Sequence, residues 1–241
     1  MYGEGKEMKA VSLIGNKKSG KTTLAGELAD YIRSHGYRVG YAKFSRHGFD
    51  LPPTDTAKML TRAQAVAGIS EHQSMILWPN SRYLLDIIPQ LEADVLIIEG
   101  GSDLGLAPRV LIPKEEGRDD RKLDPKLAAA SWKRSLGSRL PVMHTIQELG
   151  DYVLTRGFLL PGLNCGSCGR LSCAHLAGEI VRGEAGVKDC QALQGKMSIR
   201  INGQALGLNP FVEGIIAGSI RGMLSQLKGF SPGKIEINLE S

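Results

Sequence analysis

The residues with the clearest chemistry lie near the N-terminus, in the stretch GNKKSGKT from Gly15 to Thr22. This is a complete G-x-x-x-x-G-K-S/T pattern, the signature of a phosphate-binding P-loop. Its glycines let backbone N–H groups turn toward phosphate oxygens, Lys21 reaches the β- and γ-phosphates, and the Thr22 hydroxyl binds Mg²⁺. We expect the nucleotide to contact Gly15, Asn16, Lys17, Lys18, Ser19, Gly20, Lys21, Thr22 and Thr23.

The flanking sequence gives this motif its required setting. Residues 9–14 are predicted to form a buried strand, and residues 21–36 an amphipathic helix that stops at Gly36. The N-terminus of such a helix adds a positive dipole end to the phosphate site. A glycine-rich turn without a ligand is the alternative, which this setting disfavours. Lys17 and Lys18 either add charge near the phosphates or are ordinary solvated lysines.

A second acid is needed to complete the Mg²⁺ shell. Glu99 ends the apolar run DVLIIEGG, at the edge of the predicted sheet where ligands bind in open α/β folds. We therefore predict catalytic roles for Lys21 and Glu99, and Mg²⁺ ligation by Thr22, Glu99 and Asp55. Glu99 could instead only cap its strand, and Asp55 and Asp50 are weaker candidate acids. Because no N/T-K-x-D segment follows a strand, ATP and GTP both remain open.

Four cysteines form the second candidate site. Cys165, Cys168 and Cys173 fall within nine positions, and Cys190 follows later. Clustered thiols in a reducing compartment indicate a metal site rather than disulfides. Structural zinc commonly uses two C-x-x-C pairs. Here one such pair is followed by two separate cysteines, a spacing that favours an iron–sulfur cluster of the 4Fe-4S type. Zinc remains the main alternative, and free thiols the remaining one.

Composition restricts the class of protein. The chain has 241 residues, of which 42% are hydrophobic and 23% charged, with a net charge of +5. No apolar run reaches the about 18 residues that a membrane helix needs. The N-terminal stretch MYGEGKEMKA lacks the apolar centre of a secretory signal. We therefore expect a cytoplasmic protein without a membrane or nucleic-acid partner, whose mild basicity suits phosphorylated ligands.

Strand and helix patterns alternate through the first two thirds of the chain. Such alternation predicts an α/β fold of the P-loop NTPase type, with a mostly parallel sheet and helices on both faces. Expected strands lie at 9–14, 37–44, 74–78, 93–101, 107–113 and 140–145; expected helices lie at 21–36, 54–68, 79–93 (bent or broken at Pro89) and 146–157. Residues 114–125 are polar and are expected to form a surface loop.

The pattern changes after residue 157. Residues 158–164 are expected to be a linker, and residues 196–208 a hairpin that turns at Asn202–Gly203. A helix is predicted from Asn209, as its N-cap, to Gly229, and a strand at 233–240. We expect two domains: a P-loop nucleotide-binding domain at 1–157, and a small α+β iron–sulfur domain at 158–241.

Four stretches together resemble the MobB-type molybdopterin-guanine dinucleotide biosynthesis proteins: LIGNKKSGKTTL, YRVGYAKFSRHGFD, DVLIIEGG and APRVLIP. In the second stretch Lys43, His47 and Asp50 fit the family's layout of a lysine, a histidine-rich turn and an acid. Phe44 and Arg46 depart from it, since the family often has histidines there. The pair Asp55–Thr56 also fits. This resemblance covers roughly residues 9–155.

The cysteine stretch is similar to a small four-iron module of corrinoid and acetyl-CoA pathway proteins. The resemblance implies a fusion: a MobB-like protein that carries an iron–sulfur module. It also implies a nucleotide-binding accessory role in molybdenum or tungsten cofactor biosynthesis, with GTP, slow hydrolysis and a molybdopterin or nucleotidylating partner. A nucleotide-gated redox or metal-delivery protein for a metalloenzyme is the alternative, and a structural cluster a third. A homodimer is compatible with all three.

Overall fold

The computed structural model describes most of the chain, namely residues 8–45, 48–49, 54–114, 127–136, 140–195, 197, 199–201, 204–231 and 233–239. Several sequence-based expectations lie outside the described residues: Arg46, His47 and Asp50, the turn Asn202–Gly203, and all but the first residue of the loop at 114–125.

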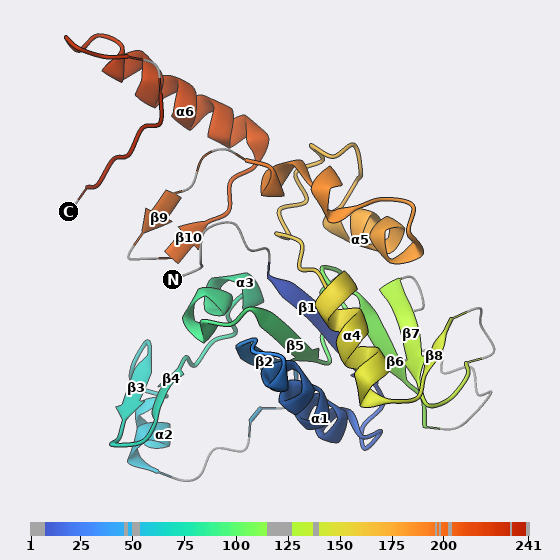
Figure 1. Cartoon of the computed structure of the whole chain (residues 1–241). Coiled ribbons are helices and arrows are strands. Elements are labelled where there is room, and N and C mark those ends of the chain that lie inside the picture. Colours follow the sequence, from blue (N-terminus) through green and yellow to red (C-terminus); the bar gives the residue numbers. More distant parts are fainter. Residues whose placement is uncertain are drawn as a thin grey trace.

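A six-stranded parallel sheet forms the centre of the molecule (Figure 1). Its strand order is β2-β5-β1-β6-β7-β8, and every neighbouring pair runs parallel. The central strands are continuous apolar runs because a parallel sheet is covered on both faces. The strands are β1 (Lys9–Gly15), β2 (Val39–Lys43), β5 (Val95–Glu99), β6 (Arg109–Ile112), β7 (Ala128–Trp132) and β8 (Val142–Met143).

Two helices cover one face of this sheet (Figure 1). They are α1 (Lys21–Ser34) and α4 (Ile146–Arg156), and their apolar sides share one core with β1, β5 and β6. Leu28 and Ile32 of α1 and Leu149 of α4 are fully buried in that core. Thr145 begins α4 with a capping box, in which its hydroxyl accepts the Glu148 N–H and the Glu148 carboxylate accepts the Thr145 N–H.

The opposite face carries shorter elements. These are α3 (Leu84–Ile87) with η1 (Ile88–Leu91), the extended segment after α4, and α5 (Cys173–Arg182). Leu84 and Ile88 pack on β5, and Leu160 and Leu176 form a neighbouring cluster. The prediction of a parallel sheet with helices on both faces is confirmed. The expected linker at 158–164 is partly buried, because Phe158 and Leu160 enter this second core.

A projecting hairpin corrects the prediction for residues 54–78. Helix α2 (Asp55–Met59) is followed by β3 (Val66–Ile69) and β4 (Ser74–Leu77), an antiparallel pair outside the main sheet. The expected helix over 54–68 is therefore wrong in its second half. The Ser70 N–H donates to the Gln73 carbonyl at 2.9 Å and closes the turn between β3 and β4.

The last part of the chain follows α5. Two short 3₁₀ turns, η3 (Val187–Asp189) and η4 (Gln191–Leu193), flank Cys190. The antiparallel strands β9 (Ile199–Ile201) and β10 (Gln204–Leu206) confirm the hairpin prediction. Helix α6 (Pro210–Leu224) begins at its expected N-cap, Asn209, but ends earlier than expected. The described residues 233–239 form no strand, so the predicted terminal strand is wrong.

Within the parts of the chain that the structure describes, no helix is both long enough and apolar enough to cross a bilayer.

Candidate functional site

The P-loop connects β1 to α1 through residues in unusual backbone conformations. Lys18 and Gly20 have φ values of 64° and 87°, and Gly20 is the N-cap of α1. A Cβ on Gly15 would lie 2.5 Å from the Ser19 hydroxyl and 2.7 Å from the Ile112 carbonyl oxygen. Because these distances are too short for any side chain, Gly15 is required where the loop passes close to β6.

Lys21 lies inside this loop. Its ammonium group donates hydrogen bonds to the carbonyl oxygens of Gly15 at 2.9 Å and Asn16 at 2.6 Å. Burial lowers the pKa of Lys21, the carboxylate of Glu99 opposes this shift, and the ammonium groups of Lys43 and Lys114 add to it. A cation held by two neutral carbonyls and partly stripped of water is poised to exchange those partners for phosphate oxygens.

Glu99 collects three side chains at the end of β5. Thr22 donates to its Oε2 at 2.8 Å, Tyr41 donates to the same oxygen at 2.5 Å, and the Lys43 ammonium lies 3.5 Å from Oε1. Burial raises the pKa of the Glu99 carboxyl, but the hydrogen bonds from Tyr41 and Thr22 and the charge of Lys43 outweigh it, so the pKa is lowered. Glu99 is therefore a buried carboxylate that stays ionised.

The spacing of Thr22 and Glu99 suits a shared cation. Mg²⁺ prefers octahedral oxygen ligands at about 2.0–2.1 Å, so adjacent ligand oxygens lie about 2.9 Å apart. The hydroxyl oxygen of Thr22 and the carboxylate oxygen of Glu99 are 2.8 Å apart. These two residues thus fit a Mg²⁺ site beside the phosphate loop in both donor chemistry and spacing.

The structure brings together some of the predicted site residues and not others. Lys21, Thr22 and Glu99 meet at the ends of β1 and β5. Asp55 does not join them: its side chain is 97% exposed, pairs with Lys58, and lies on α2 beside the projecting hairpin (Figure 1). The exposed Lys17 and Lys18 flank the loop.

Two partners of Glu99 were not assigned a role from the sequence. Tyr41 and Lys43 lie two positions apart on β2, so their side chains share one face of the strand. β2 pairs with β5 in a register that sets Lys43 opposite Glu99. The signal was the adjacency of two parallel strands, which becomes visible only once the strand order is known.

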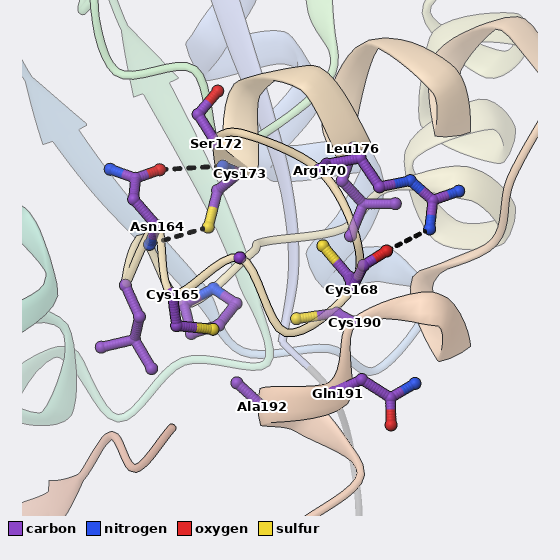
Figure 2. Close-up of a pocket in the computed structure, with 13 residues that line it drawn as sticks. Asn164, Cys165, Cys168, Arg170, Ser172, Cys173, Leu176, Cys190, Gln191 and Ala192 are labelled. Carbon is purple, nitrogen blue, oxygen red and sulfur yellow. Dashed lines mark hydrogen bonds between the residues drawn. The ribbon is translucent and has the colours of Figure 1, made fainter. Parts of the chain in front are cut away.

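The four cysteines line one pocket, shown in Figure 2. Cys165 and Cys168 come from the loop before α5, Cys173 is the first residue of α5, and Cys190 lies between η3 and η4. Cys173 and Cys190 are buried, whereas Cys165 is exposed. The loop turns through Gly166 and Gly169, with φ values of 70° and 79°, and the Gly169 N–H donates to the Gly166 carbonyl at 2.8 Å.

Two polar residues hold the walls of this pocket (Figure 2). Asn164 exchanges two hydrogen bonds with Cys173, one of them to its sulfur. Arg170 donates to the Cys168 carbonyl oxygen at 2.7 Å and to the Glu179 carboxylate at 2.9 Å. The cysteine loop is therefore tied to α5 at two points.

The donor set suits a thiolate-bound metal centre. Four thiols at one pocket are soft ligands of the kind that iron–sulfur clusters and zinc take. Burial raises the pKa of Cys190, while a hydrogen bond from Ser167 lowers the pKa of Cys165. Loading would release protons, because metal ligation requires thiolates. Among the described side chains, no group of three or more His, Cys, Asp or Glu is arranged to hold a single metal ion.

The loop after β5 runs from the phosphate site to the cysteine pocket. It begins at Glu99 and returns to β6 without a helix. A Cβ on Gly105 would lie 2.9 Å from Cβ of Ala174, the second residue of α5. Leu106 packs in the same cluster as Cys173 and Cys190, and its carbonyl accepts the Leu160 N–H at 2.9 Å. One short segment thus contacts both candidate sites.

Comparison with protein families identifies the first part of the chain. The family model described as "Molybdopterin guanine dinucleotide synthesis protein B" matches residues 10–131, just over half of the chain. The chain belongs to the MobB family. In this MobB-family chain, the matched span includes the P-loop and Glu99, and ends one residue before the end of β7.

A second family model, described as "Putative Fe-S cluster", matches residues 160–192. That span contains the four cysteines, together with Asn164 and Arg170. The resemblance of the two parts of the chain to MobB proteins and to an iron–sulfur module is thereby confirmed.

Two relatives extend the comparison. A curated protein of Methanocaldococcus jannaschii, the "Putative molybdopterin-guanine dinucleotide biosynthesis adapter protein", is 25% identical over 250 residues, covering 97% of this chain and 98% of the relative. The crystal structure of Bacillus subtilis MobB superposes with a TM-score of 0.50 at 23% identity, covering 61% of this MobB-family chain and 97% of that structure. The latter match shows the shared fold.

Proposed function

We propose that this MobB-family chain is a GTP-binding accessory protein of molybdopterin-guanine dinucleotide biosynthesis that carries a 4Fe-4S cluster. The observation that carries the proposal is the contact between Thr22 and Glu99, 2.8 Å apart beside Lys21. The contact supports the proposal because it joins the P-loop to the end of β5, where a nucleotide-bound Mg²⁺ would be held. The name of the curated relative, an adapter in the same biosynthesis, supports the pathway.

In this proposal the site works by positioning and charge neutralisation. The loop amides and Lys21 bind the β- and γ-phosphates, and Thr22 and Glu99 hold Mg²⁺. Tyr41 and Lys43 keep Glu99 ionised and correctly placed. We propose that hydrolysis by the chain alone is slow, and that the bound nucleotide is presented to a partner that forms the dinucleotide cofactor.

The cysteine pocket is the second part of the proposal. Cys165, Cys168, Cys173 and Cys190 would each bind one iron. A cluster bound there would supply one-electron transfer. We propose that the chain divides after residue 157 into the nucleotide-binding domain and the iron–sulfur domain, with residues 158–164 packed between them.

A second candidate function is a nucleotide-gated redox or metal-delivery protein for a metalloenzyme. One observation favours it: the segment between β5 and β6 starts at Glu99 and packs against α5 and the buried cysteines. A movement of Glu99 on binding Mg–nucleotide would therefore reach the pocket through a few residues. A cluster that served only as a structural support would need no such connection.

The proposal is tested on the full chain purified without oxygen. We expect about four irons and four sulfides per chain, and a broad absorption band that bleaches with dithionite. The Cys190→Ser variant should yield a labile or three-iron species, since one iron loses its protein ligand. Calorimetry with Mg–GTP should detect binding that Lys21→Ala abolishes while the protein stays folded.

Each arm has a result that contradicts its part of the proposal. A colourless anaerobic preparation with one zinc and no sulfide would remove the cluster. Unchanged GTP affinity in folded Lys21→Ala would remove the phosphate site, and tighter binding of Mg–ATP than Mg–GTP would correct the base. For the pathway role, the chain should accelerate dinucleotide formation by a molybdopterin nucleotidyltransferase, and Lys21→Ala should not.

A further inference from the structure

Asn164 has a backbone conformation that few residues adopt. It precedes Cys165 and has a φ of 46°, in the left-handed region. Most side chains are strained there, whereas asparagine and aspartate tolerate it better because they can hydrogen-bond locally. The conformation turns the Asn164 N–H back toward α5 rather than out to solvent.

Two hydrogen bonds join Asn164 to Cys173, as the dashed lines in Figure 2 show. The Cys173 N–H donates to Oδ1 of Asn164 at 2.8 Å, and the Asn164 N–H donates to the sulfur of Cys173 at 3.4 Å. Cys173 is the first residue of α5, so its N–H has no partner within the helix. Asn164 supplies that partner from nine residues earlier in the chain.

The second bond is more than a helix cap. The Ser172 hydroxyl already caps α5 by accepting the His175 N–H at 3.3 Å. Arg170 holds the loop by its contact to the Cys168 carbonyl, which involves backbone and not sulfur. Asn164 instead fixes the backbone of a cysteine and directs its own N–H at the sulfur of the same residue.

We propose that Asn164 is a positioning residue for the iron–sulfur cluster: its side chain clamps Cys173, and this clamp holds the Asn164 backbone N–H against the Cys173 sulfur and so sets the reduction potential. The inference rests on the proposed cluster and goes beyond its four cysteine ligands. Hydrogen bonds to the sulfurs are among the factors that set cluster potentials. A donor at a thiolate stabilises the more negatively charged reduced state, so this contact raises the potential.

The test uses anaerobically purified full chain, reconstituted with ferrous iron and sulfide. Two quantities are measured: the midpoint potential, and the rate of iron release to a chelator. Asn164→Gly keeps the left-handed conformation and the backbone N–H but removes the Oδ1 acceptor, so the N–H is no longer held against the Cys173 sulfur. At a fixed solution potential, we expect about a tenfold higher ratio of oxidised to reduced cluster, equivalent to about 59 mV for one electron. Iron release should be faster.

A conservative variant and a matched control separate this role from general destabilisation. Asn164→Asp retains an acceptor for the Cys173 N–H, so iron release should stay near the wild-type rate, while its added charge lowers the potential. Asn209 caps α6 through the Val212 N–H at 2.9 Å and does not line the cysteine pocket. Asn209→Ala therefore removes a comparable cap and should change neither quantity.

The outcomes are distinguishable. A wild-type potential in cluster-loaded Asn164→Gly overturns the proposal, even if iron release is faster, because the side-chain clamp would then not control the N–H contact to the sulfur. If Asn164→Gly takes up no cluster, the Asn164→Asp protein decides: it retains the acceptor for the Cys173 N–H, so iron release faster than in the wild type overturns the proposal. A wild-type chain without iron and sulfide contradicts the proposed cluster itself, whatever the variants do.

Discussion

At the scale of single residues, the environment of Glu99 explains how a buried acid remains charged. Its carboxylate is 6% exposed, which alone would favour the protonated form. Two hydroxyl donors and one ammonium group compensate for the lost water. Binding of Mg²⁺ would replace the Thr22 hydrogen bond by a shared ion, for which the charge of Glu99 and the 2.8 Å spacing of the two oxygens are suitable.

The first prediction concerns the choice of acid. Glu99→Gln keeps the size of the side chain but removes the charge, so Mg²⁺ loses its anionic ligand. We expect GTP still to bind. The factor by which Mg²⁺ tightens GTP binding should fall about tenfold or more, and so should the rate of any hydrolysis. Calorimetry across a Mg²⁺ series measures this. Asp55→Asn is the matched control and should behave as wild type. If Asp55→Asn has the larger effect, Glu99 is not the metal ligand.

A site residue could be predicted from the sequence when its role depends on neighbouring residues in the chain, but not when it depends on how distant strands and loops pack. The P-loop is local: a contiguous motif between a strand and a helix defines it, so roles for Lys21 and Thr22 could be predicted without a structure. Tyr41 was not, because its role depends on β2 lying beside β5. Asn164 was missed for a similar reason, since its contacts to Cys173 depend on the path of the cysteine loop.

At the scale of elements, prediction succeeded where periodicity was strong. Helix α1 and strand β5 have clear patterns and were placed within a few residues. Strand β7 was missed because its sequence AAASW has few β-branched residues. Its position between β6 and β8 is enforced by burial, since Ala130 and Ser131 are fully buried. The terminal strand was wrongly predicted from alternation alone, which gives no partner strand.

The second prediction tests a local signal that stabilises a whole element. Thr145→Ala removes the hydroxyl that accepts the Glu148 N–H at 3.2 Å at the start of α4. Since α4 packs on α1 and β1, we expect a loss of about 1 kcal/mol in the free energy of unfolding, measured by urea denaturation. Thr155→Ala, at an exposed position in the last turn of the same helix, should be near neutral. Equal losses of unfolding free energy in the two variants would mean that the capping hydrogen bond does not stabilise α4.

At the scale of the whole molecule, the two candidate sites are joined by one segment of the chain, the connection between β5 and β6. The phosphate site lies at the carboxyl ends of β1 and β5, and α5 packs near β7 on the opposite face from α1 (Figure 1). The connection between β5 and β6 contains Gly100, Gly101 and Gly105, all at positive φ. Gly100 and Gly101 pack closely on Phe44, and Gly105 packs on α5. If Glu99 moves, the segment that follows it moves against Phe44 near its start and against α5 at Gly105.

The last prediction tests whether this connection couples the sites. If GTP and the cluster favour the same arrangement of the segment, loading either must change the affinity for the other by the same factor, about fivefold or more for typical coupling. Calorimetry should therefore give different GTP dissociation constants for the empty and the cluster-loaded chain.

In Gly105→Ala the added methyl group would meet Ala174 at 2.9 Å, so the difference between the two dissociation constants should shrink. Gly36 also has a positive φ, of 81°, but in Gly36→Ala the methyl group enters open space, so the coupling should persist. Equal dissociation constants for the empty and loaded wild-type chain would exclude nucleotide gating and leave the accessory role with an independent cluster.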